Sequence, residues 1–142
     1  MKIAIIGREN VGKSTLFNCL TGSRKALTSN EAGTTRDNKF GTVTWRDASF
    51  TLIDTAGLNI TQDTVIGKEV KKKIEKAISE TDMLIFLVDG QTGIVPQERE
   101  IAKLIRKSQK KYFLVVNKID SAKKDYLVDE FDKLGLGKGL GV

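Results

Sequence analysis

A glycine-rich segment between an apolar run and a helical pattern constrains the fold of this chain more than any other feature. Residues 7–14 read G-R-E-N-V-G-K-S and fit the pattern G-x-x-x-x-G-K-[ST]. The apolar run 2–6 predicts a buried parallel strand, and residues 15–20 predict the start of a helix. A strand, a tight turn and a helix N-terminus together aim backbone N–H groups at an anion. The segment is therefore predicted to be a phosphate-binding loop.

The residue types in this loop match the needs of a nucleoside triphosphate. Gly7 and Gly12 let the chain curl and approach phosphates without an intervening Cβ. Lys13 supplies a positive charge for the β- and γ-phosphates, and the Ser14 hydroxyl is the expected Mg²⁺ ligand. The loop thus predicts binding of a nucleoside triphosphate.

Apolar runs alternate with helical patterns along the rest of the chain. The segment 39–46 alternates like an edge strand and is expected to form a hairpin with the strand that ends at Asp54. This order predicts one α/β domain, a three-layer P-loop fold with a mostly parallel sheet and one antiparallel edge strand. Strands are predicted at 3–6, 39–46, 51–53, 83–88 and 112–116, and helices at 65–79, 97–108 and 122–134.

Apolar positions on two of the helices predict their buried faces. Cys19 is expected to be a buried structural thiol beside Leu16 and Leu20 on the first helix. Val65 is expected to begin the apolar stripe of the second helix.

The composition of the chain excludes some kinds of chemistry and indicates a location and a type of partner. The 142 residues contain no histidine, one cysteine and no apolar stretch that could span a membrane, and their net charge is +6. Histidine-based catalysis and metal binding are therefore excluded in this segment. A single unpaired cysteine indicates a reducing compartment, and a cytoplasmic location is expected. The positive charge favours an anionic partner such as RNA, although part of it is what any phosphate-binding protein carries.

Asp54-Thr55-Ala56-Gly57 directly follows a predicted strand. The Asp54 carboxylate can hold Mg²⁺, usually through water, and the Gly57 N–H can reach a γ-phosphate. Alone, D-x-x-G is more often a plain turn. Its place forty residues after a phosphate loop favours the functional interpretation.

Asn117-Lys118-Ile119-Asp120 closes the predicted strand 112–116. The Asp120 carboxylate can accept hydrogen bonds from N1–H and the N2 amino group of guanine, and adenine offers neither donor. Asn117 is expected to brace the loop and the Lys118 stem to cover the base. An isolated N-K-x-D is more often a helix-capping turn, but after the upstream motifs it predicts guanine specificity.

Two further segments are open to more than one interpretation. In Gly33-Thr34-Thr35-Arg36-Asp37 either threonine could reach Mg²⁺ and the γ-phosphate, or the segment is a polar surface loop. The stretches 23–38 and 58–64 are predicted to be mobile switches. A basic cluster on the following helix is either a solvated face or a surface for RNA or another partner; it comprises Lys68, Lys71, Lys72 and Lys73.

The ordered set of motifs resembles the first GTPase domain of the Der (EngA) family. The matching runs are G-R-x-N-V-G-K-S-T-L-F-N, L-T-G-S-R-K-A-L, G-T-T-R-D, L-I-D-T-A-G-L, L-V-D-G-Q-T-G and V-N-K-I-D. The Era and tRNA-modifying GTPase families share some elements, but the runs 17–27 and 87–100 favour Der. Members of that family are bacterial ribosome-biogenesis proteins with two tandem GTPase domains and a C-terminal KH-like domain.

The resemblance implies a small-GTPase-like fold and Mg²⁺-dependent GTP hydrolysis stimulated by K⁺, acting in assembly of the large ribosomal subunit. The resemblance implies that Thr35 is the switch threonine, that Gly57 senses the γ-phosphate, and that Asn10 helps to coordinate K⁺. The implied catalytic residues are Lys13, Thr35, Gly57 and Asn10, and the implied Mg²⁺ ligands are Ser14, Thr35 and Asp54. The implied contacts to GTP or GDP are Gly7, Arg8, Glu9, Asn10, Val11, Gly12, Lys13, Ser14, Thr15, Asp54, Thr55, Ala56, Gly57, Asn117, Lys118 and Asp120.

Three departures from the family pattern qualify this prediction. Leu58 stands where many small GTPases carry a water-orienting glutamine, and Glu9 stands where the family typically has proline. The family also continues beyond Val142 with a final strand and a Ser-Ala motif that supports the base. Residues 1–142 are therefore predicted to be a Der-type GTPase domain that is incomplete at its C-terminus. The second GTPase domain and the KH-like domain, expected neighbours together with ribosomal RNA, would lie outside it.

Two other functions compete with a GTPase switch. One is a nucleotide-gated binding module with negligible hydrolysis, which Leu58 favours. The other is an ATPase or small-molecule kinase, which Asp120 argues against.

Overall fold

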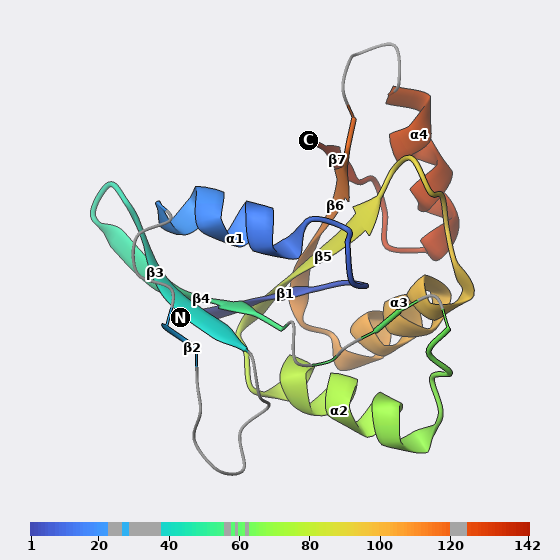
Figure 1. The fold of residues 1–142 in the computed structure, drawn as a ribbon, viewed down its shortest axis with the longest axis horizontal. Helices are drawn as coiled ribbons and strands as arrows, with labels where there is room; N and C mark the ends of the chain where they lie inside the picture. The colour runs from blue at the N-terminus through green and yellow to red at the C-terminus, as the bar shows by residue number, and fades with distance from the viewer. Residues whose placement is uncertain (23–26, 29–37, 56–57, 59, 62, 120–124) are drawn as a thin grey trace.

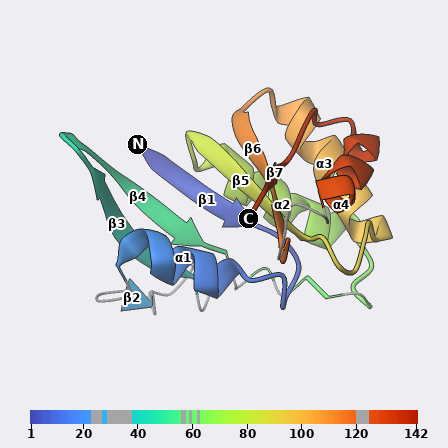
Figure 2. The same ribbon diagram turned by 90° about the horizontal axis from the view of Figure 1, so that it is seen from above.

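The computed structural model describes residues 1–22, 27–28, 38–55, 58, 60–61, 63–119 and 125–142. In this part of the chain a central sheet separates helix α1 on one face from helices α2, α3 and α4 on the other (Figures 1 and 2). The predicted three-layer α/β arrangement is confirmed.

The described residues form one sheet of seven strands in the order β2-β3-β4-β1-β5-β6-β7. The pairs on both sides of β1, and onward to β7, are parallel, whereas β3 runs antiparallel to β4 and β2 antiparallel to β3. The mostly parallel sheet is therefore as predicted. The strands are β1 (Lys2–Ile6), β2 (Leu27–Thr28), β3 (Lys39–Trp45), β4 (Ala48–Asp54), β5 (Met83–Asp89), β6 (Lys111–Asn117) and β7 (Leu140–Gly141).

Both borders of the sheet differ from the prediction in detail. The antiparallel strand β3 is an edge strand only beyond Phe40, because β2 pairs with Lys39 and Phe40 on its outer side. The expectation that the last strand lies wholly beyond Val142 was wrong, since Leu140 and Gly141 already pair with β6. Both β2 and β7 are two residues long, and so short a strand has no alternation for a sequence pattern to reveal.

The helices begin and end near their predicted limits. α2 starts three residues later than predicted because Gly67 at its N-cap is extended, with φ −84° and ψ −170°. Val65 consequently lies outside the helix and is 81% exposed, so its predicted place in the apolar stripe was wrong. The predicted helix 122–134 is divided in two, and residues 122–124 lie outside the described part. The helices are α1 (Lys13–Thr21), α2 (Lys68–Ser79), α3 (Pro96–Ser108), α4 (Asp125–Glu130) and the 3-10 helix η3 (Phe131–Leu134).

Side chains alternate between two hydrophobic clusters, one on each face of the sheet. In β1, Ala4 belongs to the cluster under α2 and α3, and Ile5 belongs to the cluster under α1. Phe17 is the fully buried side chain that α1 places in the second cluster. Cys19 is exposed, so the expectation of a buried thiol was wrong. Two positions along a helix turn the side chain by about 200°, which points Cys19 away from the face that Phe17 buries.

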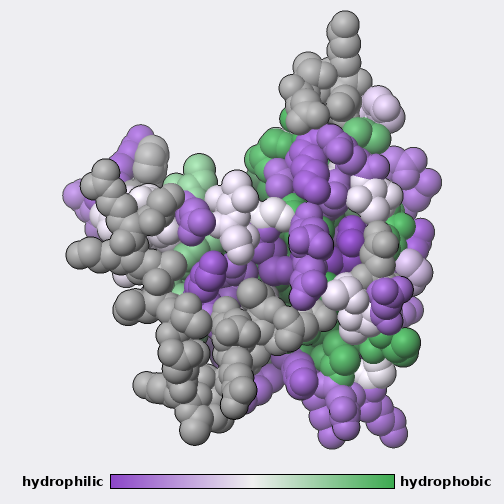
Figure 3. Space-filling view, in the orientation of Figure 1, coloured by the Kyte–Doolittle hydropathy of each residue, from purple (hydrophilic) through white to green (hydrophobic). Residues whose placement is uncertain are grey.

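The parallel pairing sets the position of the candidate site. Because β1, β4, β5 and β6 are mutually parallel, their carboxyl ends meet at one edge of the sheet. Hydrophilic side chains gather over this region, around the loop between β1 and α1 (Figure 3). None of the helices in the described residues is both long enough and apolar enough to cross a bilayer.

Candidate functional site

The loop between β1 and α1 passes very close to its neighbours at two glycines. A Cβ on Gly7 would lie 2.5 Å from the carbonyl oxygen of Leu87 in β5. Gly12 has a φ of +104°, and a Cβ there would collide with Nδ2 of Asn117. Glycine alone satisfies both positions without strain, and the backbone takes the tight curl that a phosphate-binding loop needs.

This curl leads directly into the N-terminus of α1. The N-cap residue Gly12 has no side chain, and no side-chain hydrogen bond caps the helix. The first N–H groups of α1 and the positive end of its dipole thus face the loop. Such an end is suited to an anion such as a phosphate.

Lys13 places its ammonium group inside the loop. Its Nζ donates to the carbonyl oxygens of Gly7 and Arg8, each at 2.8 Å, and the side chain is buried. Burial lowers the pKa of Lys13, while the nearby carboxylates of Asp54 and Glu9 act in the opposite direction. A positive charge is thus held where a β- or γ-phosphate would approach the loop.

Ser14 and Asp54, forty positions apart in the sequence, meet beside the first turn of α1. Ser14 Oγ donates to Asp54 Oδ2 at 3.2 Å. Asp54 is fully buried, and no hydrogen-bond donor among the described residues reaches its Oδ1. Thr55 fixes the end of β4, since its Oγ1 donates to the Ile5 carbonyl at 2.6 Å. A hydroxyl and a carboxylate with a free oxygen are donors that Mg²⁺ accepts, so the pair fits that ion.

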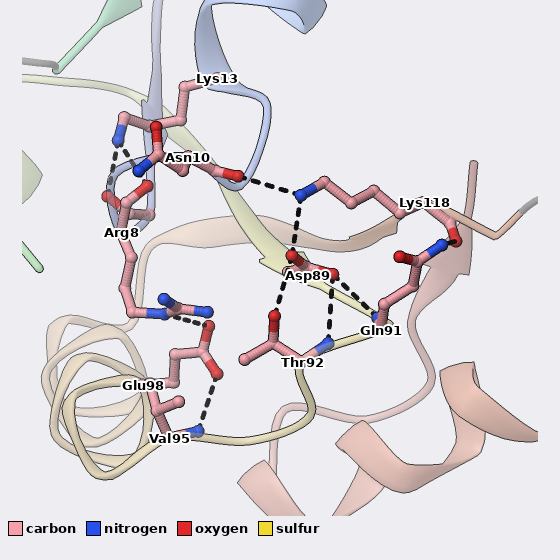
Figure 4. Close-up of polar contacts among 10 residues, drawn as sticks. Arg8, Asn10, Lys13, Asp89, Gln91, Thr92, Val95, Glu98 and Lys118 are labelled. Carbon is pink, nitrogen blue, oxygen red and sulfur yellow. Dashed lines mark hydrogen bonds and ion pairs between the residues drawn. The ribbon is translucent and has the colours of Figure 1, made fainter. Parts of the chain in front are cut away.

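At the end of β6, Asn117 and Lys118 contact the same loop from the other side. Asn117 Nδ2 donates to the carbonyl oxygen of Val11 at 2.9 Å. Lys118 Nζ donates to the carbonyl oxygen of Asn10 at 3.2 Å and forms an ion pair with Asp89 Oδ2 at 2.9 Å (Figure 4). The two residues therefore tie the end of β6 to the phosphate loop.

Asp89, at the end of β5, is a residue that the sequence analysis did not single out. Besides Lys118, it accepts hydrogen bonds from the Gln91 N–H at 2.8 Å and from the Thr92 hydroxyl at 3.0 Å. Burial would raise the pKa of Asp89, but the hydrogen bonds from Lys118, Gln91 and Thr92 outweigh it and hold the pKa below its ordinary value. Its position at the end of a buried strand, next to Asn117 in the sheet, was the available signal.

A buried ion pair joins the loop to the start of α3. Arg8 Nε lies 3.3 Å from Glu98 Oε2, and the two side chains are 6% and 0% exposed. Glu98 Oε1 also accepts the Val95 N–H at 3.1 Å, at the N-terminus of α3 (Figure 4). Burial raises the pKa of Glu98, and the contacts with Val95 and Arg8 oppose that shift. Arg8 belongs to the predicted loop, but Glu98 could not be foreseen as its partner.

Several predicted residues lie outside the described part of the chain: Thr34, Thr35, Ala56, Gly57 and Asp120. Glu9, Ser14 and Thr15 lie in the described loop and helix and are exposed. Leu58 is described, and its side chain packs against the cluster under α2 and α3. The structure thus brings the loop, Asp54 and the end of β6 together, whereas Thr34, Thr35 and Asp120, predicted to form a switch and to read the base, lie outside the described residues.

Comparison with known proteins agrees with this geometry. A family model described as "50S ribosome-binding GTPase" matches residues 2–118. The chain belongs to this GTPase family. The expectation of a GTPase is thereby confirmed at the level of the family.

Individual relatives show which GTPases within this family the chain resembles. The GTPase Der of Porphyromonas gingivalis is 42% identical over 135 residues, which cover 95% of this chain and 31% of that protein. The GTPase Der of Flavobacterium johnsoniae is 45% identical, with the same coverage. These matches confirm the resemblance to the Der family, and the chain spans about a third of the length of these relatives.

Two solved structures show the same fold. The G domain of the T. maritima FeoB iron transporter matches with a TM-score of 0.67 and 29% identity, covering 100% of this chain and 85% of that one. A bacterial selenocysteine-specific elongation factor, EF-Sec, matches with a TM-score of 0.64 and 22% identity, covering 100% of this chain and 25% of that one. The predicted small-GTPase-like fold is confirmed.

Proposed function

We propose that this chain binds GTP and GDP with Mg²⁺, hydrolyses GTP, and is stimulated by K⁺. The observation that carries the proposal is the meeting of Ser14 with the buried Asp54, whose Oδ1 has no donor among the described residues. Lys13 lies in the adjoining loop with its ammonium group on two loop carbonyls. A cation, a hydroxyl and a carboxylate are thus gathered at one helix N-terminus.

Each group has a role in this proposal. Lys13 and the first N–H groups of α1 bind the β- and γ-phosphates, and Gly57 contacts the γ-phosphate. Ser14, Asp54 and Thr35 hold Mg²⁺, with Asp54 acting directly or through water. Mg²⁺ held by these residues would supply positive charge that offsets the negative charge developing on the phosphates. The remaining loop residues and Thr55 shape the pocket around the phosphates.

Leu58 cannot orient the attacking water in the proposed hydrolysis of GTP. Its side chain has no hydrogen-bonding group and packs against the core, so another group has to stabilise the reaction. We assign that role to K⁺ held in part by the exposed Asn10, whose amide oxygen is a suitable ligand. Intrinsic turnover is expected to be slow.

Steady-state phosphate release separates this proposal from a binding module without hydrolysis. The rate is measured with GTP and Mg²⁺ at equal ionic strength in KCl and in NaCl. A severalfold higher rate in KCl supports a K⁺-stimulated GTPase. Nucleotide binding without K⁺-dependent turnover would instead favour the nucleotide-gated module.

The base preference has its own test at Asp120. In the proposal the Asp120 carboxylate accepts hydrogen bonds from guanine, while Asn117 and Lys118 hold the loop around it. Asp120→Asn should shift preference from guanosine toward xanthosine triphosphate, because an amide can donate where xanthine presents O2. Unchanged GTP selectivity in calorimetry would mean that the base site is misplaced, and equal competition by ATP would favour an ATPase or kinase.

At the cellular level we propose a cytoplasmic role in assembly of the large ribosomal subunit. Support comes from the family match and from relatives named GTPase Der. The proposed partners are ribosomal RNA and, in a longer protein, a second GTPase domain and a KH-like domain. Co-sedimentation with large subunits should be stronger with a non-hydrolysable GTP analogue than with GDP. Equal co-sedimentation in both states would contradict a nucleotide-controlled role.

A further inference from the structure

A polar cavity of about 370 Å³ borders the phosphate loop beside Lys118 and Asp89. Four stretches far apart in the sequence contribute to its lining: the loop itself, Thr61 with Asp63, the end of β5 with the segment after it, and Lys118 after β6. Its lining residues are Arg8, Glu9, Asn10, Thr61, Asp63, Asp89, Thr92 and Lys118. Thr61 and Asp63 follow Gly57 in the sequence by a few residues. Because Gly57 is the proposed γ-phosphate contact, the position of Thr61 and Asp63 affects how that contact can form.

The first link across this cavity comes from the main chain of Glu9. Its N–H donates to the carbonyl oxygen of Ile60 at 2.7 Å, and the Ile60 side chain is 1% exposed. The link exists because position 9 carries a residue with an amide hydrogen; proline, the typical residue of the resembled family, would have none. One end of the segment 60–64 is thereby fixed to the phosphate loop.

The second link fixes the other end of that segment. Gln97 Nε2, at the start of α3, donates to the carbonyl oxygen of Thr64 at 2.8 Å. Between the two links the chain forms a tight turn, in which the Thr61 N–H donates to Thr64 Oγ1 at 2.9 Å and the Thr64 N–H donates to the Thr61 carbonyl at 3.2 Å. The described residues of this segment are therefore held at both ends and are called the 60–64 turn below; they are Ile60, Thr61, Asp63 and Thr64.

The third link closes the ring. Gln97 is followed by Glu98, whose carboxylate pairs with Arg8, the neighbour of Glu9 in the loop (Figure 4). The chain of contacts thus runs from Arg8 and Glu9 through the 60–64 turn to Gln97 and Glu98, and back to Arg8. Four members of this ring are buried, so it has few ways to rearrange without breaking a contact; they are Arg8, Ile60, Gln97 and Glu98.

We propose that Glu9 and Gln97 are positioning residues, which hold the 60–64 turn against the phosphate loop and thereby favour the contact that the preceding segment is proposed to make with the γ-phosphate. The inference rests on the proposed GTP site and deepens it. A segment that is already ordered loses less conformational freedom when a ligand contacts it, and its affinity rises accordingly. GDP lacks the γ-phosphate, so the benefit falls on the triphosphate and not on the diphosphate.

The test compares two variants at position 9. Glu9→Pro removes the N–H donor, whereas Glu9→Ala removes the carboxylate and keeps the donor. The affinities of GDP and of guanosine imidotriphosphate are measured with Mg²⁺ by calorimetry on this chain. The ratio of triphosphate to diphosphate affinity is expected to be about fivefold lower in Glu9→Pro than in Glu9→Ala, the effect of one lost hydrogen bond.

A third variant reaches the same turn from outside the loop. Gln97→Met has a similar volume but no donor for the Thr64 carbonyl, and it leaves the loop backbone unaltered. It should lower the same affinity ratio severalfold relative to the unaltered chain. If Glu9→Pro does not fold, Gln97→Met still tests whether holding the 60–64 turn raises the affinity for the triphosphate.

The outcomes are distinguishable. Equal ratios in Glu9→Pro and Glu9→Ala, or an unchanged ratio in Gln97→Met, would overturn the positioning role. So would an equal loss of both nucleotides, because it would show an effect on the phosphate loop as a whole. Failure of the unaltered chain to bind GDP would contradict the proposed function itself, and this inference with it.

Discussion

At the scale of single residues, the buried positive charge of Lys13 indicates most specifically that the site binds an anion. Its buried ammonium group has exchanged water for two loop carbonyls, and burial lowers its pKa. A triphosphate offers this charge stronger acceptors than a carbonyl, because its oxygens carry formal negative charge that also attracts the ammonium group directly. The group is therefore prepared for the ligand even without it.

Lys13→Ala should accordingly abolish measurable nucleotide binding. The loss is expected to be on the order of a hundredfold or more, because the variant lacks both the charge and its hydrogen bonds. Calorimetry with GDP and Mg²⁺ measures it, and Lys103→Ala, an exposed position on α3, is the matched control. Affinity retained in Lys13→Ala would contradict the assignment of the phosphate loop.

The lowered pKa of Asp89 predicts how its contribution to stability depends on pH. Because its pKa is lower in the folded chain than its ordinary 3.8, the unfolded chain binds more protons in that range. The stabilisation by Asp89 should therefore be complete near neutral pH and disappear as the pH falls below about 3.8. Urea unfolding of the unaltered chain and of Asp89→Asn should show a difference at pH 7 that shrinks at pH 3. A difference that grows on acidification would contradict the contacts described for Asp89.

At the scale of elements, the N-terminus of α3 depends on one buried carboxylate. Glu98 neutralises Arg8 and accepts the Val95 N–H, and neither function has a substitute among the described residues. Removing one partner of a buried ion pair leaves the other charge uncompensated. The docking of α3 on the loop is thus more sensitive to Glu98 than to any exposed charge of the helix.

Glu98→Ala should lower the free energy of unfolding by about 3–5 kcal/mol. Glu98→Gln keeps an acceptor for Val95 and is expected to lose less. Glu100→Ala, on the exposed face of the same helix, is the control and should change stability by at most about 0.5 kcal/mol. Urea denaturation measures all three, and similar losses in Glu98→Ala and Glu100→Ala would show that the buried pair is unimportant.

The elements also show what a sequence pattern can and cannot reveal. β1, β5, β6 and α3 were predicted to within one residue at each end, because apolar runs and Pro96 at a helix start are local signals. β4 begins at Ala48, three residues before its predicted start. β2 and β7 are too short for such a signal, and the late start of α2 follows from the extended backbone of Gly67 at its N-cap. The pairing of Arg8 with Glu98, 90 positions away, arises only when β1 and α3 meet in space. The motifs thus located the loop, but its supporting partners are a product of the tertiary structure.

At the scale of the whole molecule, the two faces of the sheet are covered unequally. α1 packs on β1, β3 and β4 (Figure 2), and Phe17 fills the contact. Toward β6 and β7 on the same face, Phe113 is 50% exposed and Leu140 is 54% exposed. Phe113 shares this face with Val115, because side chains two positions apart on a strand point the same way.

This unequal cover makes the two phenylalanines a matched pair for measuring how α1 stabilises the chain. Phe17→Ala should cost about 3–5 kcal/mol, because it opens a cavity under the helix that carries the phosphate site. Phe113→Ala loses a side chain that is already half in water and should cost about 1 kcal/mol, in proportion to the smaller apolar area. Thermal unfolding should show a drop of roughly 10 °C for Phe17→Ala and a few degrees for Phe113→Ala. Equal losses in the two variants would mean that α1 contributes no more to the fold than the open part of the same face, which the complete burial of Phe17 argues against.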